Sequence, residues 1–363
     1  MAGISFVQQI SDFTYQRILP TLVDNVNNSN IGWSRAFSKP ETWTGPVIWS
    51  NFTTANSATG GSYSGMDEFS TTATNNTIKM YFHPAAYYQS VVVPGLDRAV
   101  NASKSSQAIS LILQKMDEAK IAASMNLGTQ IYGYGLGKDI DGYGLIVDAG
   151  SNTSSYGDLT RSTYPAINAD VTAVTSGIIT LDYLSSEADN ISAAGNAESY
   201  PTIGLMQKAP WRYIEGIMQV MLGARYETTQ TRGYNRVSGG VPLGTSVRPD
   251  SAALGGAAGF ESITYRNRPL VADDAAPSQT FFWLNEHWLK GSRLLQDDLR
   301  NIDSNIKITE GTLKSNPSPS AFQWRDFMNS INQNGKLGVL LFAGNYYCRQ
   351  PRRQGKLTGI TSN

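Results

Sequence analysis

The chain has 363 residues, of which 40% are hydrophobic and 16% are charged, with 29 basic residues balancing 29 acidic ones. This length suggests two or three compact units, and the balanced charge excludes both a strongly basic nucleic-acid binder and an acidic disordered chain. A single cysteine and two histidines exclude an internal disulfide and a metal cluster built from His and Cys alone, and they fit a reducing compartment.

The first twenty residues carry Phe6, Ile10, Phe13 and Ile18 at roughly helical spacing and end at Pro20. We expect a short amphipathic helix or arm there, and its apolar side must dock on another surface. The N-terminal sequence has neither a basic region nor an uninterrupted apolar stretch, so neither a secretion signal nor a membrane span is predicted.

Residues 43–88 are predicted to form a long hairpin. PVIWSNFTT and TIKMYFHPAAYYQSVVV have strand composition, and the tract between them, SATGGSYSGMDEFSTTATNN, is rich in Gly, Ser and Thr. A connection of this length is commonly functional, so its tip is expected to reach a partner. Gly60, Gly61 and Gly65 are expected to set the bend, because glycine adopts positive φ without a Cβ clash.

A helix is predicted over Ser103–Tyr132, the clearest element of the chain. Apolar residues recur there at i, i+3, i+4 and i+7, as at Ile109, Met116 and Leu127. Thirty residues make a rod of roughly 45 Å, which is long for a globular domain.

Mixed helix and strand signals follow. ITLDYLSSEADNI predicts a strand-to-helix step or a helix alone, YPTIGLMQ a buried strand, and APWRYIEGIMQVML a helix. FESITYRNRPLVADD and SQTFFWLN predict strands, with Asn285 capping a short helix at EHWLK, and the chain closes in β structure.

The residues that could carry catalysis are few. Asp273 and Asp274 form the best carboxylate pair, although a plain turn explains them equally well. His83 is interpreted as a partly buried strand residue and Cys348 as a small apolar residue of a terminal strand. Glu286-His287 lacks a second histidine one turn later. We therefore predict no catalytic, cofactor-binding or metal-binding residues, and no enzyme.

The order of these elements resembles the major capsid proteins of tailed bacteriophages with the HK97-type fold. Local sequences resemble them as well, in order from about residue 43 to 360: TGGSYSGMD, LILQKMDEAKIAASMNLGTQIYG, DGYGLIVDAG, DLTRSTYPAINADV, TYRNRPLVADDAAPSQTFFWLNEHWLK and GNYYCRQPRRQGKLTGI. The resemblance implies an α+β, HK97-like capsid fold. Its parts would be an N-terminal arm (1–42), an extended hairpin loop (43–88), a peripheral domain with the long spine helix (89–155), an α/β axial domain (156–334), and closing strands that return to both domains (335–363).

The resemblance also implies a function. The chain would assemble with itself into hexamers and pentamers of an icosahedral shell that encloses double-stranded DNA, which it would contact weakly and without sequence preference. Portal and possibly scaffold or decoration proteins would be further partners, with no membrane, and the virion would assemble in the bacterial cytoplasm. Two alternatives are a β-rich surface or adhesin-like protein and, less favoured, a hydrolase that uses the pair at Asp273 and Asp274.

The residues expected at contacts between subunits lie in the arm, the hairpin tip and the C-terminal region. The C-terminal region carries Lys356 and several arginines without an acidic residue, while the tip carries Asp67 and Glu68. We therefore expect these two regions to meet between neighbouring subunits. The expected contact residues are Phe6, Ile10, Gly60, Gly61, Met66, Asp67, Glu68, Arg349, Arg352 and Arg353.

Overall fold

The computed structural model describes residues 30–43, 45–54, 61–68, 75–96, 105–193, 196–218, 262–294, 322–329 and 334–362. Within these ranges the α-helices are α3 (Ile31–Ala36), α5 (Ser105–Gln130), α6 (Tyr143–Ile146) and α7 (Leu181–Ile191), and residues 208–218 are also helical. Short 3-10 helices are η2 (Pro165–Ile167), η3 (Thr175–Gly177), η4 (Ala197–Ser199) and η7 (Pro351–Arg353). No helix in this part of the chain combines the length and the hydrophobicity needed to cross a membrane.

The described strands fall into two larger sheets and two small ribbons. Their bounds are β1 Glu41–Trp43, β2 Ile48–Thr53, β3 Thr77–Phe82, β4 Ala85–Pro94, β5 Ser155–Tyr156, β6 Leu159–Thr160, β7 Asp170–Ala173, β8 Ile203–Met206, β9 Ser262–Tyr265, β10 Arg268–Ala272, β11 Thr280–Leu284, β12 Leu289–Leu294, β13 Phe322–Asn329, β14 Gly335–Cys348 and β15 Gly355–Thr358.

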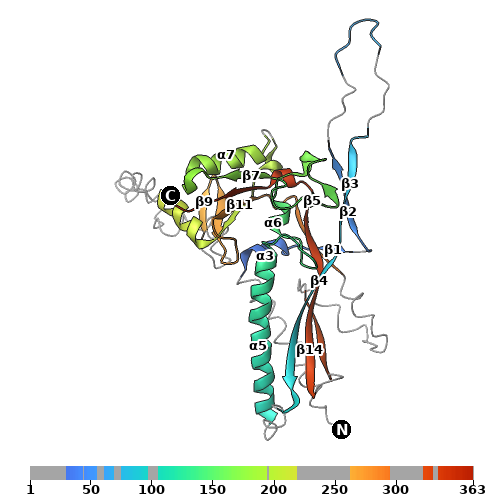
Figure 1. Ribbon diagram of the computed structural model, residues 1–363, viewed down its shortest axis with the longest axis vertical. Helices are drawn as coiled ribbons and strands as arrows, with labels where there is room; N and C mark the ends of the chain where they lie inside the picture. Colours follow the sequence, from blue (N-terminus) through green and yellow to red (C-terminus); the bar gives the residue numbers. More distant parts are fainter. Residues whose placement is uncertain are drawn as a thin grey trace, which may run out of the picture.

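The first sheet is built around β14. Its order is β1-β12-β14-β13, and β4 pairs with β14 along the opposite edge, from Ala85 to Pro94. The long helix α5 covers one face, as Figure 1 shows. Its apolar side chains at spacings of three and four, such as Met116 and Ala123, share a buried cluster with Val91 and Val93 of β4. The predicted rod helix is thus confirmed; its 26 residues make about 39 Å.

The second sheet has six strands in the order β7-β15-β11-β8-β10-β9. Helix α7 packs against β15 and β7 and is capped by Thr180, whose side chain accepts a hydrogen bond from the backbone N–H of Tyr183. The β9–β10 hairpin turns at Arg266 and Asn267, both with positive φ, which matches the twist of paired strands. The helix expected within ITLDYLSSEADNI is confirmed as α7, and the strands predicted at YPTIGLMQ, FESITYRNRPLVADD and SQTFFWLN are confirmed as β8 to β11.

The C-terminal region joins the two sheets, because β14 lies in the first and β15 in the second. The axial segment that the resemblance implies, 156–334, contains residues 289–294 and 322–329, and the structure pairs β12 and β13 with β14. The predicted axial segment therefore includes strands of the first sheet. Sheet membership depends on pairing partners that are distant in sequence, so composition cannot assign it.

Strands β12 and β13 follow one another along the same edge of β14. Arg293 pairs with Gly344, whereas Phe322 pairs with Phe342, two residues before Gly344 in β14. The chain therefore leaves this edge after β12 and returns to nearly the same place with β13. Residues 295–321 connect two parts of one sheet edge.

Replacing residues 295–321 with a short Gly-Ser linker is expected to leave the folded chain intact. The ends to be joined are already held by β14, and the entropy of closing a loop changes only slowly with its length. Circular dichroism and thermal unfolding should show the wild-type spectrum and a midpoint within a few degrees. Loss of cooperative unfolding would contradict this. Deleting β13 itself serves as the destabilising control.

Two local predictions are wrong. Residues 286–288 form a turn that leads into β12 instead of a helix at EHWLK; the side chain of Asn285 accepts a hydrogen bond from the backbone N–H of His287 and so closes the turn. His83 lies between β3 and β4 with an exposed side chain, and its Nε2 is 2.9 Å from a carboxylate oxygen of Asp158. Tertiary pairing of the next strand overrides the local helix signal.

Candidate assembly surfaces

The hairpin of β2 and β3 projects away from the two sheets (Figure 1). Its strands pair in antiparallel register from Ile48 opposite Phe82 to Thr53 opposite Thr77. Side chains alternate between two faces, and at the base Met80 and Phe82 are buried against the body of the protein. A two-stranded ribbon is marginally stable by itself in water, so its outer part needs another surface to pack on.

The opposite face of the hairpin is exposed and aromatic. Trp49 and Tyr81 are directly opposite each other in the register, and the Lys79 ammonium lies 4.6 Å from the centre of the Trp49 ring. Exposed aromatic side chains next to a cation are typical of contact surfaces.

The described part of the hairpin tip is residues 61–68. Met66 is fully exposed, and Asp67 accepts a hydrogen bond of 2.8 Å from the backbone N–H of Ser64, which orders the turn. Only Gly65 of the expected bend residues has positive φ within this part of the tip, at 60°; Gly61 does not. Gly60 lies outside the described residues. The prediction that Gly61 requires glycine is therefore wrong, and Gly65 takes that role.

Gly65→Val is expected to distort the tip and reduce assembly, while Gly61→Val serves as the matched control. Valine at positive φ costs roughly 1–2 kcal/mol, whereas a Cβ at Gly61 meets nothing within 4 Å. Both variants should give wild-type circular dichroism, and only Gly65→Val should lower the yield of assembled particles in sedimentation. Equal yields would show that the turn does not matter.

The basic residues of the C-terminal region are dispersed. Arg349 pairs with Glu41 of β1 at 3.1 Å, and Arg353 donates to the backbone carbonyl of Ile191. Lys356 is buried, so its expected place in an exposed basic group is wrong. Arg352 remains exposed. Arg349 is exposed as well but is already paired with Glu41, so we take Arg352 as the exposed cation of this group for a contact with a neighbour.

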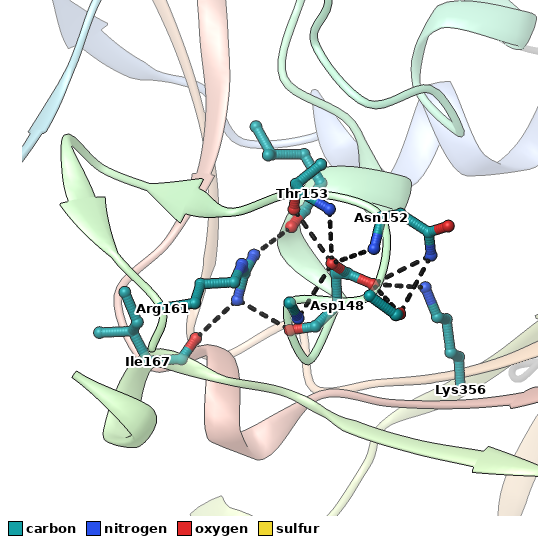
Figure 2. A network of polar contacts seen from close by, with 9 residues as sticks. Asp148, Asn152, Thr153, Arg161, Ile167 and Lys356 are labelled. Atoms are coloured by element: carbon teal, nitrogen blue, oxygen red, sulfur yellow. Dashed lines mark hydrogen bonds and ion pairs between the residues drawn. The ribbon is translucent and has the colours of Figure 1, made fainter. Parts of the chain in front are cut away.

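Lys356 belongs to a buried polar network, shown in Figure 2. Its ammonium lies 3.4 Å from Asp148, whose carboxylate also accepts bonds from the backbone N–H groups of Asn152 and Thr153. Burial opposes ionisation of Asp148, but these hydrogen bonds and the Lys356 charge outweigh it and hold the pKa of the carboxyl well below its usual range. The network ties the loop after α6 to β15 of the second sheet.

Arg161 completes this junction, and among the described residues it forms no ion pair with a carboxylate. Its guanidinium donates to the backbone carbonyls of Leu145, Asp148 and Ile167, at 2.6, 2.8 and 3.0 Å (Figure 2). In the sequence, Arg161 is marked only as the single arginine within DLTRSTYPAINADV. Its role is visible only once its carbonyl partners are brought together.

A cleft of about 760 Å³ opens beside the hairpin base, lined by residues around His83, the loop 134–141 and residues 152–158. Burial raises the pKa of Asp141 there to about 6, despite a bond of 2.7 Å from the Asn345 side chain. No group of three or more His, Cys, Asp or Glu side chains that could hold a metal occurs among the described residues.

The two carboxylates considered for hydrolysis point into different environments. Asp273 is buried and accepts bonds from the backbone N–H of Gly32 and the hydroxyl of Tyr132, at 2.7 and 2.9 Å. Asp274 is exposed and pairs with Lys208 at 2.7 Å. They therefore do not form a shared acid–base site. Asp273 instead joins α3 to the end of α5.

Cys348 is buried in the core, and burial raises the pKa of its thiol to about 12. A thiol held protonated is a poor nucleophile and packs as a small apolar group. Phe6 and Ile10 lie outside the described residues.

Sequence reasoning missed one surface, the face of the first sheet opposite α5, here called the outer face. Directly paired residues share a face, and the register aligns Tyr88 with Leu341 and Val92 with Leu337. Tyr88 is 70% exposed and Val92 46%. The signal was present, since VVV in β4 and VLLF in β14 are apolar at consecutive positions, which indicates two apolar faces. The outer face comprises Tyr88, Val92, Met328, Leu337, Val339 and Leu341.

Comparison with solved structures finds this architecture elsewhere. The capsid asymmetric unit of cyanophage A-1(L) aligns over 89% of this chain and 90% of its own, with 10% sequence identity and a TM-score of 0.58. The capsid of a native GTA particle aligns over 90% of each chain, with 8% identity and a TM-score of 0.50. The sequence matches no protein-family model and no curated protein. At these identities the likeness shows the fold, and it confirms the HK97-type fold expected from the sequence.

Proposed function

We propose that this protein is a major capsid protein, which assembles with copies of itself into hexamers and pentamers of an icosahedral shell around double-stranded DNA. The observation that carries the proposal is a capsid fold matched over about nine tenths of the chain, bearing a hairpin that projects beyond its own body. A projecting ribbon and an exposed apolar outer face are costly in an isolated monomer, and neighbouring copies would cover both.

Other partners follow from the same proposal. The balanced charge of the chain fits weak contact with DNA that is not specific for sequence. Portal proteins, and possibly scaffold or decoration proteins, would bind the assembled shell, which would form in the bacterial cytoplasm and become part of the virion. No enzymatic step belongs to this function. The separation of Asp273 from Asp274 weighs against the hydrolase, and the long helix α5 weighs against a β-rich adhesin.

Electron microscopy of the purified chain tests the function directly. Closed shells or rings at moderate concentration support it, and discrete monomers under all assembly conditions overturn it. Deleting residues 1–20 should abolish shells while leaving the circular dichroism of the two sheets unchanged, since the arm is expected to dock on a neighbour. Normal shells from the shortened chain would remove the arm from the proposal.

Reversing the tip charges is expected to weaken assembly. We assign the contact of the tip to Arg352 of a neighbouring subunit. In the double variant Asp67→Arg with Glu68→Arg, the tip becomes positively charged and repels this arginine. Each exposed pair contributes little, but a shell repeats it many times, and salt should screen it within about 8 Å at physiological ionic strength. Sedimentation should show fewer shells, most clearly at low salt.

Adding Arg352→Glu to the reversed tip should restore part of the shell yield. Lys39→Glu, at another exposed cation, is the matched control and should restore nothing. If both additions behave alike, the tip and Arg352 do not meet.

A further inference from the structure

The base of the projecting hairpin is held by the small ribbon of β5 and β6, which comes from a distant part of the chain. The two strands are joined by Gly157 and Asp158, whose φ angles of 57° and 61° are those of a two-residue turn of type I′. The backbone carbonyl of Gly157 accepts a hydrogen bond of 3.1 Å from the N–H of Tyr81 in β3. A Cβ at Gly157 would lie 2.9 Å from the Cβ of Met80, so a larger residue would push the turn away from β3.

A second contact at the hairpin base joins two side chains that can carry charge. His83, at the corner between β3 and β4, has its Nε2 2.9 Å from a carboxylate oxygen of Asp158. Asp158 has positive φ, which residues other than glycine adopt less often, and the turn thereby directs its carboxylate toward the hairpin. The same turn thus holds the hairpin by its backbone and by a side chain. We call Gly157, Asp158 and His83 the base latch.

A buried carboxyl group lies beside the base latch, in the cleft described above. The Asn345 amide donates to the backbone carbonyl of His83 at 2.8 Å and to the carboxylate of Asp141 at 2.7 Å. Burial raises the pKa of Asp141 to about 6. The Asn345 hydrogen bond and the charge of His83 lower it by less, and the charge of Asp158 raises it further. The ionisation of Asp141 is therefore coupled to both side chains of the base latch.

The charges at the base latch favour its closed form in acid. Histidine side chains are those whose charge ordinarily changes between pH 5 and 8. When His83 is charged and Asp141 is protonated, one cation faces one carboxylate. When His83 is neutral and Asp141 is ionised, two carboxylates remain without that cation, so repulsion replaces attraction.

The contribution of Asp141 has the same sign. Its pKa in the closed structure is raised above 3.8, so its contribution to closure is complete below pH 3.8 and is lost as the pH rises through about 6. The other residues of the cleft lining that carry charge or can titrate are Lys138, Asp139, Tyr81, Tyr134 and Tyr156. Lys138 and Asp139 add one charge of each sign.

We propose that the base latch is a pH-sensitive device that fixes the direction of the hairpin, closed in acid and loosened at alkaline pH. Loosening frees β3 from the turn at Gly157, so the hairpin can move about the corner at His83 (Figure 1). The inference does not depend on the proposed function, because the base latch joins parts of one chain.

Hydrogen exchange of the Tyr81 amide tests the pH dependence, because this N–H donates to the Gly157 carbonyl. The full-length chain is kept unassembled at low concentration, and rates are corrected for the intrinsic effect of pH. Exchange should be about three- to fivefold faster at pH 8 than at pH 5, the upper range for an exposed pair. His83→Gln should remove most of this difference.

The other histidine of the chain provides the matched control. His287 is also exposed and lies 3.4 Å from a carboxylate oxygen of Glu198. His287→Gln should therefore keep the wild-type pH dependence of Tyr81 exchange. Equal exchange of wild-type Tyr81 at pH 5 and pH 8 overturns the proposal, and so does an unchanged pH dependence in His83→Gln.

A pair of glycine variants tests the geometry of the base latch. Gly157 and Gly137 both have positive φ and both line the cleft, but a Cβ at Gly137 meets nothing within 4 Å. Alanine strains the backbone at either position, whereas only Gly157→Ala pushes the turn away from Met80. Tyr81 exchange should rise about tenfold at both pH values in Gly157→Ala and change little in Gly137→Ala. Equal exchange in the two variants would show that the turn does not hold the hairpin, which also overturns the proposal.

Discussion

Asp148→Ala is expected to lower the free energy of unfolding by about 3–5 kcal/mol, because it leaves the Lys356 ammonium buried without a counter-charge. The side chain of Lys356 is only 5% exposed and that of Asp148 is fully buried. The substitution also removes the acceptor for the backbone N–H groups of Asn152 and Thr153. Guanidinium unfolding, followed by circular dichroism, should show a lower midpoint at neutral pH.

The double variant Asp148→Ala with Lys356→Met separates the two contributions. It should recover a large part of the lost stability, since the uncompensated charge is gone while the loop bonds remain lost. A double variant no more stable than Asp148→Ala would show that the ion pair is unimportant. The pKa of Asp148 is depressed, so its contribution is present above the unfolded value of 3.8 and is lost as pH falls through the folded value.

Glu187→Gln is expected to make the protein more stable than the wild type at pH 8 while changing it little near pH 4.5. Glu187 lies on α7 and is 1% exposed, and within the described structure neither of its carboxylate oxygens has a hydrogen-bond partner. Burial raises the pKa of this carboxyl from 4.5 to about 7, and the negative charge of Asp170 acts in the same direction. The Thr172 hydroxyl and the backbone of Lys356 lower it by less.

The sign follows from proton linkage. Between pH 4.5 and about 7 the folded chain keeps the Glu187 proton that the unfolded chain releases, so stability falls as pH rises. A pKa shift of this size corresponds to about 3 kcal/mol in the free energy of unfolding. The wild type loses this stability as the pH rises, and Glu187→Gln does not. Unfolding midpoints across this range measure it. Glu68→Gln makes the same chemical change at the exposed tip and serves as the control. If the unfolding midpoints of the wild type and Glu187→Gln changed in parallel with pH, the prediction would be wrong.

The candidate surfaces were only partly accessible to sequence reasoning. The tip was found because a long polar tract between two strands is conspicuous, and Met66 is indeed fully exposed. The basic residues were misjudged because acidic partners came from elsewhere: Glu41 for Arg349, and Asp148 for Lys356. Such pairs join residues hundreds of positions apart, and no local pattern records them. Whether Arg352 meets the tip stays a prediction.

Sequence by itself determined the elements whose cause is local. The spacing of apolar residues produced the rod helix α5, alternation produced the hairpin strands β2 and β3, and glycine with positive φ shaped the turn at Gly65. These features depend on side chains a few positions apart. The HK97-type fold was expected from the resemblance of these elements and local sequences, in their order, to tailed-phage capsid proteins.

Tertiary structure alone decided which strands share a sheet and which charges are accessible. Strand β14 pairs with β4, β12 and β13 along its two edges, although they lie far apart in the chain, and this pairing overrides the predicted helix at EHWLK. Tertiary packing also places Asp273 and Asp274 in different environments. Asp273 is buried against Tyr132, whereas Asp274 is exposed and pairs with Lys208. The reason is the same in each case: backbone pairing and the desolvation of charge depend on the complete set of neighbours, which exists only once the chain has folded.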